Sequence, residues 1–330
     1  DAEGATSCVA CNAGYTCPAG SVAQIPTSCA AGAHYNAPHD ACVGCPAGSV
    51  CAGGLPESQP RPCPRGGFCV AGVSASTDCP AGRYGSETGL TTASCSGECE
   101  QGYWCERGSM SAKAAPCAEG TYGNTGGLVS QSNCSSCPAG HACAEAATAP
   151  VACGPGSVQP VANEGSCVSC APGKYQGGSG ALECDACPPG SYCGLGASNA
   201  QPCPEGTHSN ATGLNSSEHC TECAAGTFCF AGSLLPSDCS AGTYAASARS
   251  KLCTACEESS YQDEEGQSAC KECEAGYTCP AGSVVMIPTS CAAGTFYNAT
   301  LDACVGCPAG SWCAGGPPAS QPRLCSRGKH

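Results

Sequence analysis

The chain has 330 residues and a formal net charge of −14, and only 12 of its residues are Lys or Arg. These basic residues are scattered, which excludes a phosphate-binding stripe and a polybasic membrane patch, so we expect no nucleic-acid partner. Cysteine (38), glycine (46) and proline (26) are abundant, whereas there are only two Trp and four Phe. A single large hydrophobic core is therefore excluded.

The cysteine content predicts a disulfide scaffold made in an oxidising compartment. A bridge that closes a loop of about 15 residues is worth about 3 kcal/mol in the chain-entropy model, which offsets part of the cost of ordering the backbone. The even count permits 19 intrachain bridges, but spacing alone does not give the connectivity. The sequence contains no apolar run of about 18 residues and no leader segment, so we expect no membrane span in it and an extracellular location, secreted or at the cell surface.

A cysteine unit recurs along the chain: C-x2-C, then C-x5-C, then another Cys after nine to eleven residues. In chain order, residues 1–62 hold two such repeats, and residues 63–133 have variant spacing with C-x3-C at Cys95 and Cys99. Residues 134–219 form a long, short and long block, and residues 220–269 a long and a short repeat. Residues 270–330 copy residues 8–68.

Larger copies enclose these units. Every cysteine from Cys134 to Cys187 has a counterpart 86 positions later, and residues 1–68 align with 263–330 at a constant offset of 262. Between 11 and 66, 44 of 56 positions are identical to their counterparts, which indicates that a block of about 262 residues was duplicated in one piece. We expect the natural protein to be longer. At the offset of 262, Cys325 corresponds to Cys63, and the next cysteine, Cys69, corresponds to position 331. A residue 331 is therefore expected to be cysteine.

Turn chemistry dominates the local sequence. Gly supplies φ > 0 in nine C-x-x-G-x-x-C loops, and Pro at the second position presets φ in five of them, so we expect short hairpins and turns only. The loops are at 11–17, 45–51, 63–69, 99–105, 137–143, 187–193, 223–229, 273–279 and 307–313. Alternating with them is C-x-x-G-x-Y with a polar glycine-rich arm, at 79–90, at 117–128 and, with His208 in the Tyr position, at 203–214. We expect the Tyr ring to cover a disulfide.

These motifs resemble the ephrin-receptor-like cysteine-rich repeat family over nearly the whole chain. The resemblance implies small disulfide-rich repeats, in which tandem short β-hairpin and loop modules form an extended rod with little helix and no single core. Such modules are related in style to tumour necrosis factor receptor and EGF-like modules, and they imply no catalytic residue, so we expect no enzyme. The chain departs from the pattern at Cys153, at Cys143 and in two shortened units, which puts the unit geometry in doubt there.

The candidate site residues are structural and glycan-bearing. Sequons predict N-glycosylation at Asn133, Asn210, Asn215 and Asn298. Pro and Ser cluster at 56–60 and 317–322, which are either spacers or O-glycan acceptors. The structural disulfide cysteines are expected to include Cys8, Cys11, Cys17, Cys29, Cys42, Cys45, Cys51, Cys63, Cys134, Cys137, Cys143, Cys153, Cys270, Cys273, Cys279, Cys291, Cys304, Cys307, Cys313 and Cys325.

Three other chemistries are less well supported. Paired C-x2-C motifs could bind zinc, but so many cysteines in a chain with sequons favour disulfides. Redox catalysis needs a low-pKa thiol at a helix N-terminus, and these pairs lie in loops. The run Asp263, Glu264 and Glu265 lacks the spaced ligands of a calcium loop. We expect no cofactor or metal.

Three functions remain open. The first is a structural subunit of an extracellular glycosylated filament, surface hair or wall fibre, with self-association or other filament subunits as partners. The second is a receptor or adhesin ectodomain or stalk that binds a protein ligand, in which unusual aromatic residues should gather in one repeat. Trp104 and Trp312 are dispersed, which favours the first. A parasite surface protein is a third reading, from the faint similarity of 325–329 (CSRGK) to the tails of such proteins.

Overall fold

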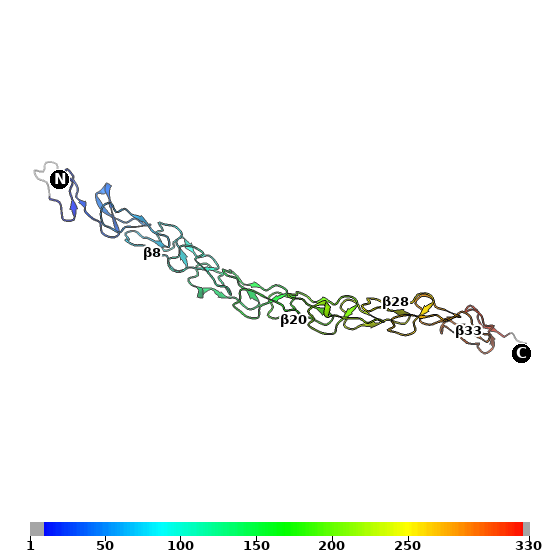
Figure 1. Cartoon of the computed structure of the whole chain (residues 1–330). Helices are drawn as coiled ribbons and strands as arrows, with labels where there is room; N and C mark the ends of the chain where they lie inside the picture. Colours follow the sequence, from blue (N-terminus) through cyan, green and yellow to red (C-terminus); the bar gives the residue numbers. More distant parts are fainter. Residues whose placement is uncertain (1–9, 326–330) are drawn as a thin grey trace. The chain divides into compact units, whose positions relative to one another are not determined.

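The structure is a computed structural model that describes residues 10–325 (Figure 1). It divides into two compact units, which are described separately. Unit 1 runs up to Gly154 and includes Val158–Val168 and Ser179–Glu183. Unit 2 comprises Pro155–Ser157, Ser169–Gly178 and the chain from Cys184 onward.

Both units consist of antiparallel hairpins, most of them with two-residue strands. The two long hairpins pair β3 (Ala33–Asn36) with β4 (Ala41–Gly44) and β33 (Thr295–Asn298) with β34 (Ala303–Gly306). The short hairpins of unit 1 are β1 (Tyr15–Thr16) with β2 (Ile25–Pro26), β5 (Ser49–Val50) with β6 (Arg61–Pro62), β7 (Gly67–Phe68) with β8 (Thr77–Asp78), β9 (Arg83–Tyr84) with β10 (Gly97–Glu98), β11 (Tyr103–Trp104) with β12 (Ala115–Pro116), β13 (Thr121–Tyr122) with β14 (Ser135–Ser136) and β15 (His141–Ala142) with β16 (Val151–Ala152).

The short hairpins of unit 2 follow the same pattern. They are β19 (Lys174–Tyr175) with β20 (Asp185–Ala186), β21 (Ser191–Tyr192) with β22 (Gln201–Pro202), β23 (Thr207–His208) with β24 (Thr221–Glu222), β25 (Thr227–Phe228) with β26 (Ser237–Asp238), β27 (Thr243–Tyr244) with β28 (Thr254–Ala255), β29 (Ser260–Tyr261) with β30 (Lys271–Glu272), β31 (Tyr277–Thr278) with β32 (Ile287–Pro288) and β35 (Ser311–Trp312) with β36 (Arg323–Leu324). The remaining strands are β17 (Ser157–Val158) and β18 (Val168–Ser169), and the helices are three 3-10 turns, η1 (Ala37–His39), η2 (Gln131–Asn133) and η3 (Ser217–His219). The predicted fold class of tandem disulfide-linked hairpin modules with little helix and no single core is confirmed.

Between residues 10 and 325, eighteen disulfides are formed, and each is local in sequence. Nine have a sequence separation of 6 and close the nine C-x-x-G-x-x-C loops: 11–17, 45–51, 63–69, 99–105, 137–143, 187–193, 223–229, 273–279 and 307–313. The other nine have separations of 13 to 17: 29–42, 79–95, 117–134, 153–167, 170–184, 203–220, 239–253, 256–270 and 291–304.

The pairing gives the C-x2-C motif a specific role. Its two cysteines belong to successive bridges: Cys42 pairs with Cys29, and Cys45 pairs with Cys51. The motif therefore joins one closed loop to the next. Cys325 is exposed and has no partner among the described residues, and Cys8 lies outside them.

The buried residues are mainly cysteines. Of the aliphatic and aromatic side chains other than Pro that the structure describes, only Val158 and Ala245 are buried, whereas 24 cysteines are. A bridge needs no large apolar neighbours to be buried between two turns. This is how a chain so poor in large apolar residues becomes ordered.

Glycines set the spacing of the turns, as Gly173 illustrates. Its φ is +85°, its N–H donates to the Cys193 carbonyl at 2.8 Å, and its carbonyl accepts the Cys187 N–H at 2.8 Å. A Cβ on Gly173 would lie within 3.0 Å of the Gly213 carbonyl oxygen. Among the described turns, thirteen glycines approach a backbone carbonyl 40 to 45 residues later in this way: Gly32, Gly48, Gly66, Gly82, Gly102, Gly120, Gly140, Gly156, Gly173, Gly190, Gly206, Gly226 and Gly242.

Four turns keep this geometry without glycine. The carbonyls that face Gly102, Gly120 and Gly206 belong to Ala146, Asn163 and Arg249, which have φ of 60°, 67° and 63°. The shortened unit at Cys256 has Ser259, with φ 69°, in the glycine position.

The backbone bonds are nevertheless conserved in these turns. The Ala146 N–H donates to the Cys117 carbonyl at 2.9 Å, and the Ser259 N–H donates to the Cys279 carbonyl at 2.8 Å. In the turn that begins at Cys153, where the sequence departs from the family pattern, the Gly156 N–H donates to the Gln176 carbonyl at 2.7 Å. The unit geometry that the sequence put in doubt is therefore kept.

We predict that Gly173→Ala destabilises its turn. A left-handed φ costs an alanine about 1–2 kcal/mol, and displacing the Gly213 carbonyl adds to that cost. The control is Gly194→Ala, because the φ of Gly194 is not positive and no neighbouring atom lies within 4 Å of the position that a Cβ would take there. Thermal unfolding and amide exchange should show a local loss of protection for Gly173→Ala only; equal effects of the two substitutions would contradict the prediction.

We predict that Ala146→Gly, in contrast, stabilises the protein. Glycine removes the cost of about 1–2 kcal/mol that alanine has at a left-handed φ, but it adds about 0.5–1 kcal/mol because glycine loses more conformational entropy on folding. The free energy of unfolding should therefore rise by about 0.5–1 kcal/mol. The exposed neighbour Ala144, which is not among the positive-φ residues, should lose stability on substitution by Gly. Calorimetry of both variants would check this, and a destabilised Ala146→Gly would refute it.

Candidate functional site

Two of the three sequons of unit 2 lie at the surface of one arm. Asn210 and its acceptor Thr212 are both exposed in the arm between β23 and β24. Asn215 is exposed in the same arm, and Ser216 caps η3 by accepting the Glu218 N–H at 3.3 Å. At Asn298, which ends β33 and is partly buried, Oδ1 accepts the Thr300 N–H at 2.8 Å.

The sequon of unit 1 is at the end of η2. Asn133 is exposed, and its Oδ1 accepts the Ser130 Oγ–H at 2.9 Å. Its acceptor Ser135 is exposed in β14, one residue after Cys134, which is bridged to Cys117. The four sequons therefore have different backbone settings, and glycosylation at each is a proposal.

The long hairpins carry a pair of polar groups that both copies of the 262-residue block retain. In unit 1 the Tyr35 hydroxyl donates to Asp40 Oδ1 at 2.7 Å, and in unit 2 Tyr297 donates to Asp302 Oδ1 at 2.5 Å. Each hydrogen bond, with the nearby carboxylate charge, raises the pKa of its tyrosine. Both aspartates have φ near +45°, so the pair fixes the tip of the hairpin.

Beside the first long hairpin, unit 1 has two shallow hollows that share Glu57 and Gln59. One is also lined by His34, Tyr35 and Pro38 from the hairpin. The other is lined by residues of β5, β6 and the loop between them, with Ser74: Val50, Ala52, Leu55, Ser58, Pro60, Arg61 and Ser74. The proline-rich segment 56–60 thus forms the wall of both hollows.

The two tryptophans have different surroundings. Trp104 in β11 is half-buried, and its Nε1 has no hydrogen-bond partner among the described residues. Trp312 in β35 is 48% exposed, and the Arg323 guanidinium lies 5.7 Å from its ring centre.

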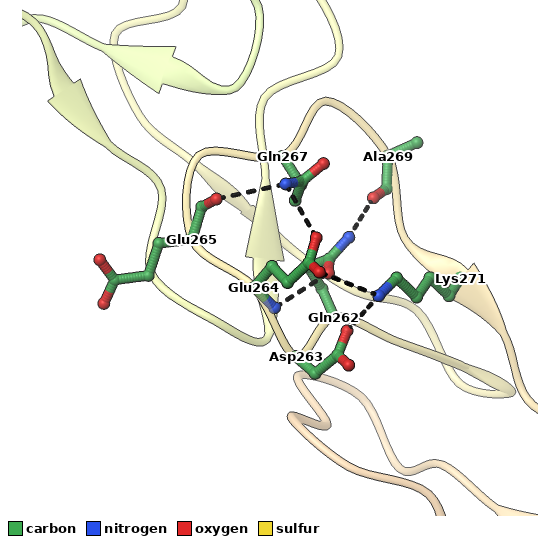
Figure 2. Close-up of polar contacts among 7 residues, drawn as sticks. All are labelled: Gln262, Asp263, Glu264, Glu265, Gln267, Ala269 and Lys271. Carbon is green, nitrogen blue, oxygen red and sulfur yellow. Dashed lines mark hydrogen bonds and ion pairs between the residues drawn. The ribbon is translucent and has the colours of Figure 1, made fainter.

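Figure 2 shows the polar arm of the shortened turn 256–270. Gln262 is 2% exposed; its Nε2 donates to the Ala269 carbonyl at 2.7 Å, and its Oε1 accepts the Glu264 N–H at 3.1 Å. Gln159 is also 2% exposed and braces its own short turn, donating to the Ser166 carbonyl at 2.7 Å. Sequence reasoning missed this brace, although Gln follows Ser-Val or Ser-Tyr in both turns.

The acidic run is held by one lysine. Lys271 Nζ lies 2.5 Å from Asp263 Oδ1 and 3.9 Å from Glu264 Oε1, whereas the Glu265 side chain points away (Figure 2). The hydrogen bond from Lys271 lowers the pKa of Asp263, and the hydrogen bond to Asp263 raises the pKa of Lys271. Two of the three carboxylates therefore face an ammonium group. In residues 10–325 no group of three or more His, Cys, Asp or Glu side chains is arranged to hold a metal ion.

We predict that Lys271→Gln raises the pKa of Asp263 toward the ordinary carboxyl value. The lowered pKa means that the pair stabilises the fold above the unfolded carboxyl pKa and loses this contribution as pH falls through the folded pKa. The raised lysine pKa means that the contribution is lost again as pH rises through the folded pKa of Lys271. Carboxyl NMR titration would measure the change, with Lys113→Gln, which removes the Lys113–Glu100 pair, as control. An unchanged pKa of Asp263 would refute the prediction.

Comparison with known proteins identifies part of unit 2. Residues 242–284 match the family model described as tyrosine-protein kinase ephrin type A/B receptor-like, and no curated protein matches the chain. The matched segment contains the bridges 256–270 and 273–279 and the glutamine brace. No helix in the part of the chain that the structure describes is long and apolar enough to cross a membrane. Residues 242–284 are therefore an ephrin-receptor-like cysteine-rich repeat, and the described chain is a tandem series of disulfide-closed turns consistent with that family.

Proposed function

We propose that this chain is a structural subunit of an extracellular glycosylated filament, surface hair or wall fibre. The observation that carries the proposal is the regular series of glycine contacts in each unit: every contact joins a turn to a carbonyl 40 to 45 residues later. A chain built in this way depends on neighbouring turns rather than on a central core, as in other repeat proteins. It can be lengthened by adding turns without changing the existing ones.

The 262-residue copy supports the same function. Its near-identity over 11–66 repeats the long hairpin, its Tyr–Asp pair and the proline-rich segment at a fixed interval in sequence. A contact surface that recurs at fixed intervals suits assembly, because a heterologous contact that does not close on itself extends into a fibre.

The disulfides and the family of residues 242–284 point to an extracellular protein. The family is a non-catalytic repeat, and we propose that the chain has no enzymatic activity and requires no cofactor. Self-association or other filament subunits would then be its partners, and glycans at Asn133, Asn210, Asn215 and Asn298 would cover part of its surface.

A receptor or adhesin ectodomain is the second candidate. The observation that favours it is the family match itself, since the family is named for a receptor. In that case one or two turns would bind a protein ligand, and the others would act as a stalk.

Electron microscopy of the native, non-reduced protein tests the proposal. We expect long filaments whose axial repeat is assignable to this chain and whose density includes glycan that endoglycosidase removes. Chains that never associate under any condition, while binding a protein ligand through a single turn, would overturn the filament function and support the receptor.

A further inference from the structure

Most C-x-x-G-x-x-C loops are tied to the turns that follow them by three backbone hydrogen bonds. In loop 223–229, the N–H groups of Gly226 and Cys229 donate to carbonyls of the turn 239–253 at 2.9 and 3.1 Å. The Cys223 carbonyl accepts an N–H from the same turn at 2.9 Å. Six of the nine loops form all three bonds: 45–51, 63–69, 99–105, 137–143, 187–193 and 223–229.

Two loops that have the same place in the 262-residue copies form none of these bonds. In loop 273–279, the glycine N–H, the second cysteine N–H and the first cysteine carbonyl have no hydrogen-bond partner among the described residues. The same three groups of its counterpart, loop 11–17, have none either within residues 10–325. Loop 307–313 is not comparable, because the partners of its counterpart, at 69–73, correspond to positions beyond residue 325.

The central glycine of each of these two loops is exposed. Gly276 and Gly14 have left-handed φ values of 92° and 85°, so the loops themselves close as the others do. However, no described atom lies within 4 Å of the position that a Cβ would take on either glycine. The thirteen glycines that approach a later carbonyl are all buried, whereas Gly276 and Gly14 are not. Both loops are therefore formed, but no described turn is stacked on their glycines.

The long hairpin accounts for the missing bonds. In the stacked turn described above, the bonding partners lie on the arm 245–250. The equivalent stretch after loop 273–279 is 297–302, which ends β33 and forms the tip of the long hairpin. Its strand residues pair with β34, and the Tyr297 hydroxyl donates to Asp302. The arm is thus bonded to its own hairpin and does not fold back on the preceding loop.

Few contacts therefore connect the chain before Cys291 with the chain after Ser290, a boundary called the joint below. Among the described residues of unit 2, no disulfide and no backbone hydrogen bond crosses it. The corresponding joint of unit 1, between Ser28 and Cys29, is likewise uncrossed within the described residues. Strand β32 contacts β34 across the first joint, and β2 contacts β4 across the second. The two sides of each joint are packed together but not bonded together.

We propose that the joint is a hinge, created by the long hairpin, so that each copy of the 262-residue block bends at one fixed place. Turns of a repeat protein are held by their nearest neighbours, and a segment with few bonds to its neighbours opens most readily. The contact of β32 with β34 keeps the two sides together while they tilt. The inference goes beyond the proposed function, because the hinge would act in a filament and in a receptor stalk alike.

Residual dipolar couplings of the full, non-reduced chain in an aligning medium test the hinge. A rigid joint gives the residues on both sides the same degree of order, whatever the angle between them. We expect the degree of order of residues 291–325 to be lower than that of residues 239–290 by at least about one third. Residues 184–238 are the control: they are bonded to 239–290 through loop 223–229 and should have the same order. Equal order on both sides of the joint would overturn the proposal.

Amide exchange of the same sample gives a second measurement. Relative to its intrinsic rate, the Gly276 N–H should exchange at least about tenfold faster than the Gly226 N–H, which is bonded to the following turn. The two glycines have the same position in their loops, so the comparison isolates the missing turn-to-turn bond. Equal protection of the two N–H groups would also overturn the proposal.

A graft tests the role of the long hairpin. Replacing residues 292–303 with residues 240–252 places the arm of a stacked turn after loop 273–279. We expect this arm to fold back on the loop, so that the order becomes equal across the joint and the Gly276 N–H becomes protected. A disulfide map shows whether the bridge 291–304 has formed in the graft. A bridged graft with the same reduced order as the wild type would overturn the proposal.

Discussion

The close approach between the glycine of one turn and a backbone carbonyl 40 to 45 residues later is the contact on which the rest of the structure depends. At Gly82, for example, a side chain would collide with the Gly127 carbonyl, so the turns can stack at this spacing only without one. The same approach brings the Gly82 N–H within 2.9 Å of the Cys105 carbonyl and its carbonyl within 3.0 Å of the Cys99 N–H. The cysteines beside these bonds become buried as a result, and their bridges form the interior.

Polar side chains add little to the backbone hydrogen bonds that join the described turns. The ion pairs, such as Arg107 with Asp78 at 3.3 Å, are exposed, and exposed pairs contribute about 0–1 kcal/mol. The buried Gln159 and Gln262 hold the arms of the turns 153–167 and 256–270, but their side chains act within a turn and not between turns. Stability is thus distributed evenly along the stacked turns of each unit. Local changes such as a glycine substitution should have local effects.

Much of this architecture could be predicted from sequence because turn chemistry is local. The C-x-x-G turns, the absence of long strands and the copies at 86 and 262 residues are all legible in the sequence. The disulfide pairing was not, since Cys42 and Cys45 are close neighbours in sequence and yet belong to different bridges. The positive φ of Ala146 and the buried position of Gln262 depend on neighbouring turns, which no local pattern specifies.

The short span of every bridge has a consequence for a protein exposed to proteases. Cys117 and Cys134 enclose the arm 123–129, and hydrolysis of a peptide bond there leaves the two new ends joined through sulfur. The same holds inside each of the eighteen loops between residues 10 and 325. A molecule nicked inside a loop therefore remains covalently continuous. Severing the chain requires either reduction together with hydrolysis or a cut in a segment between loops, and these segments have either two or three residues or nine to eleven residues.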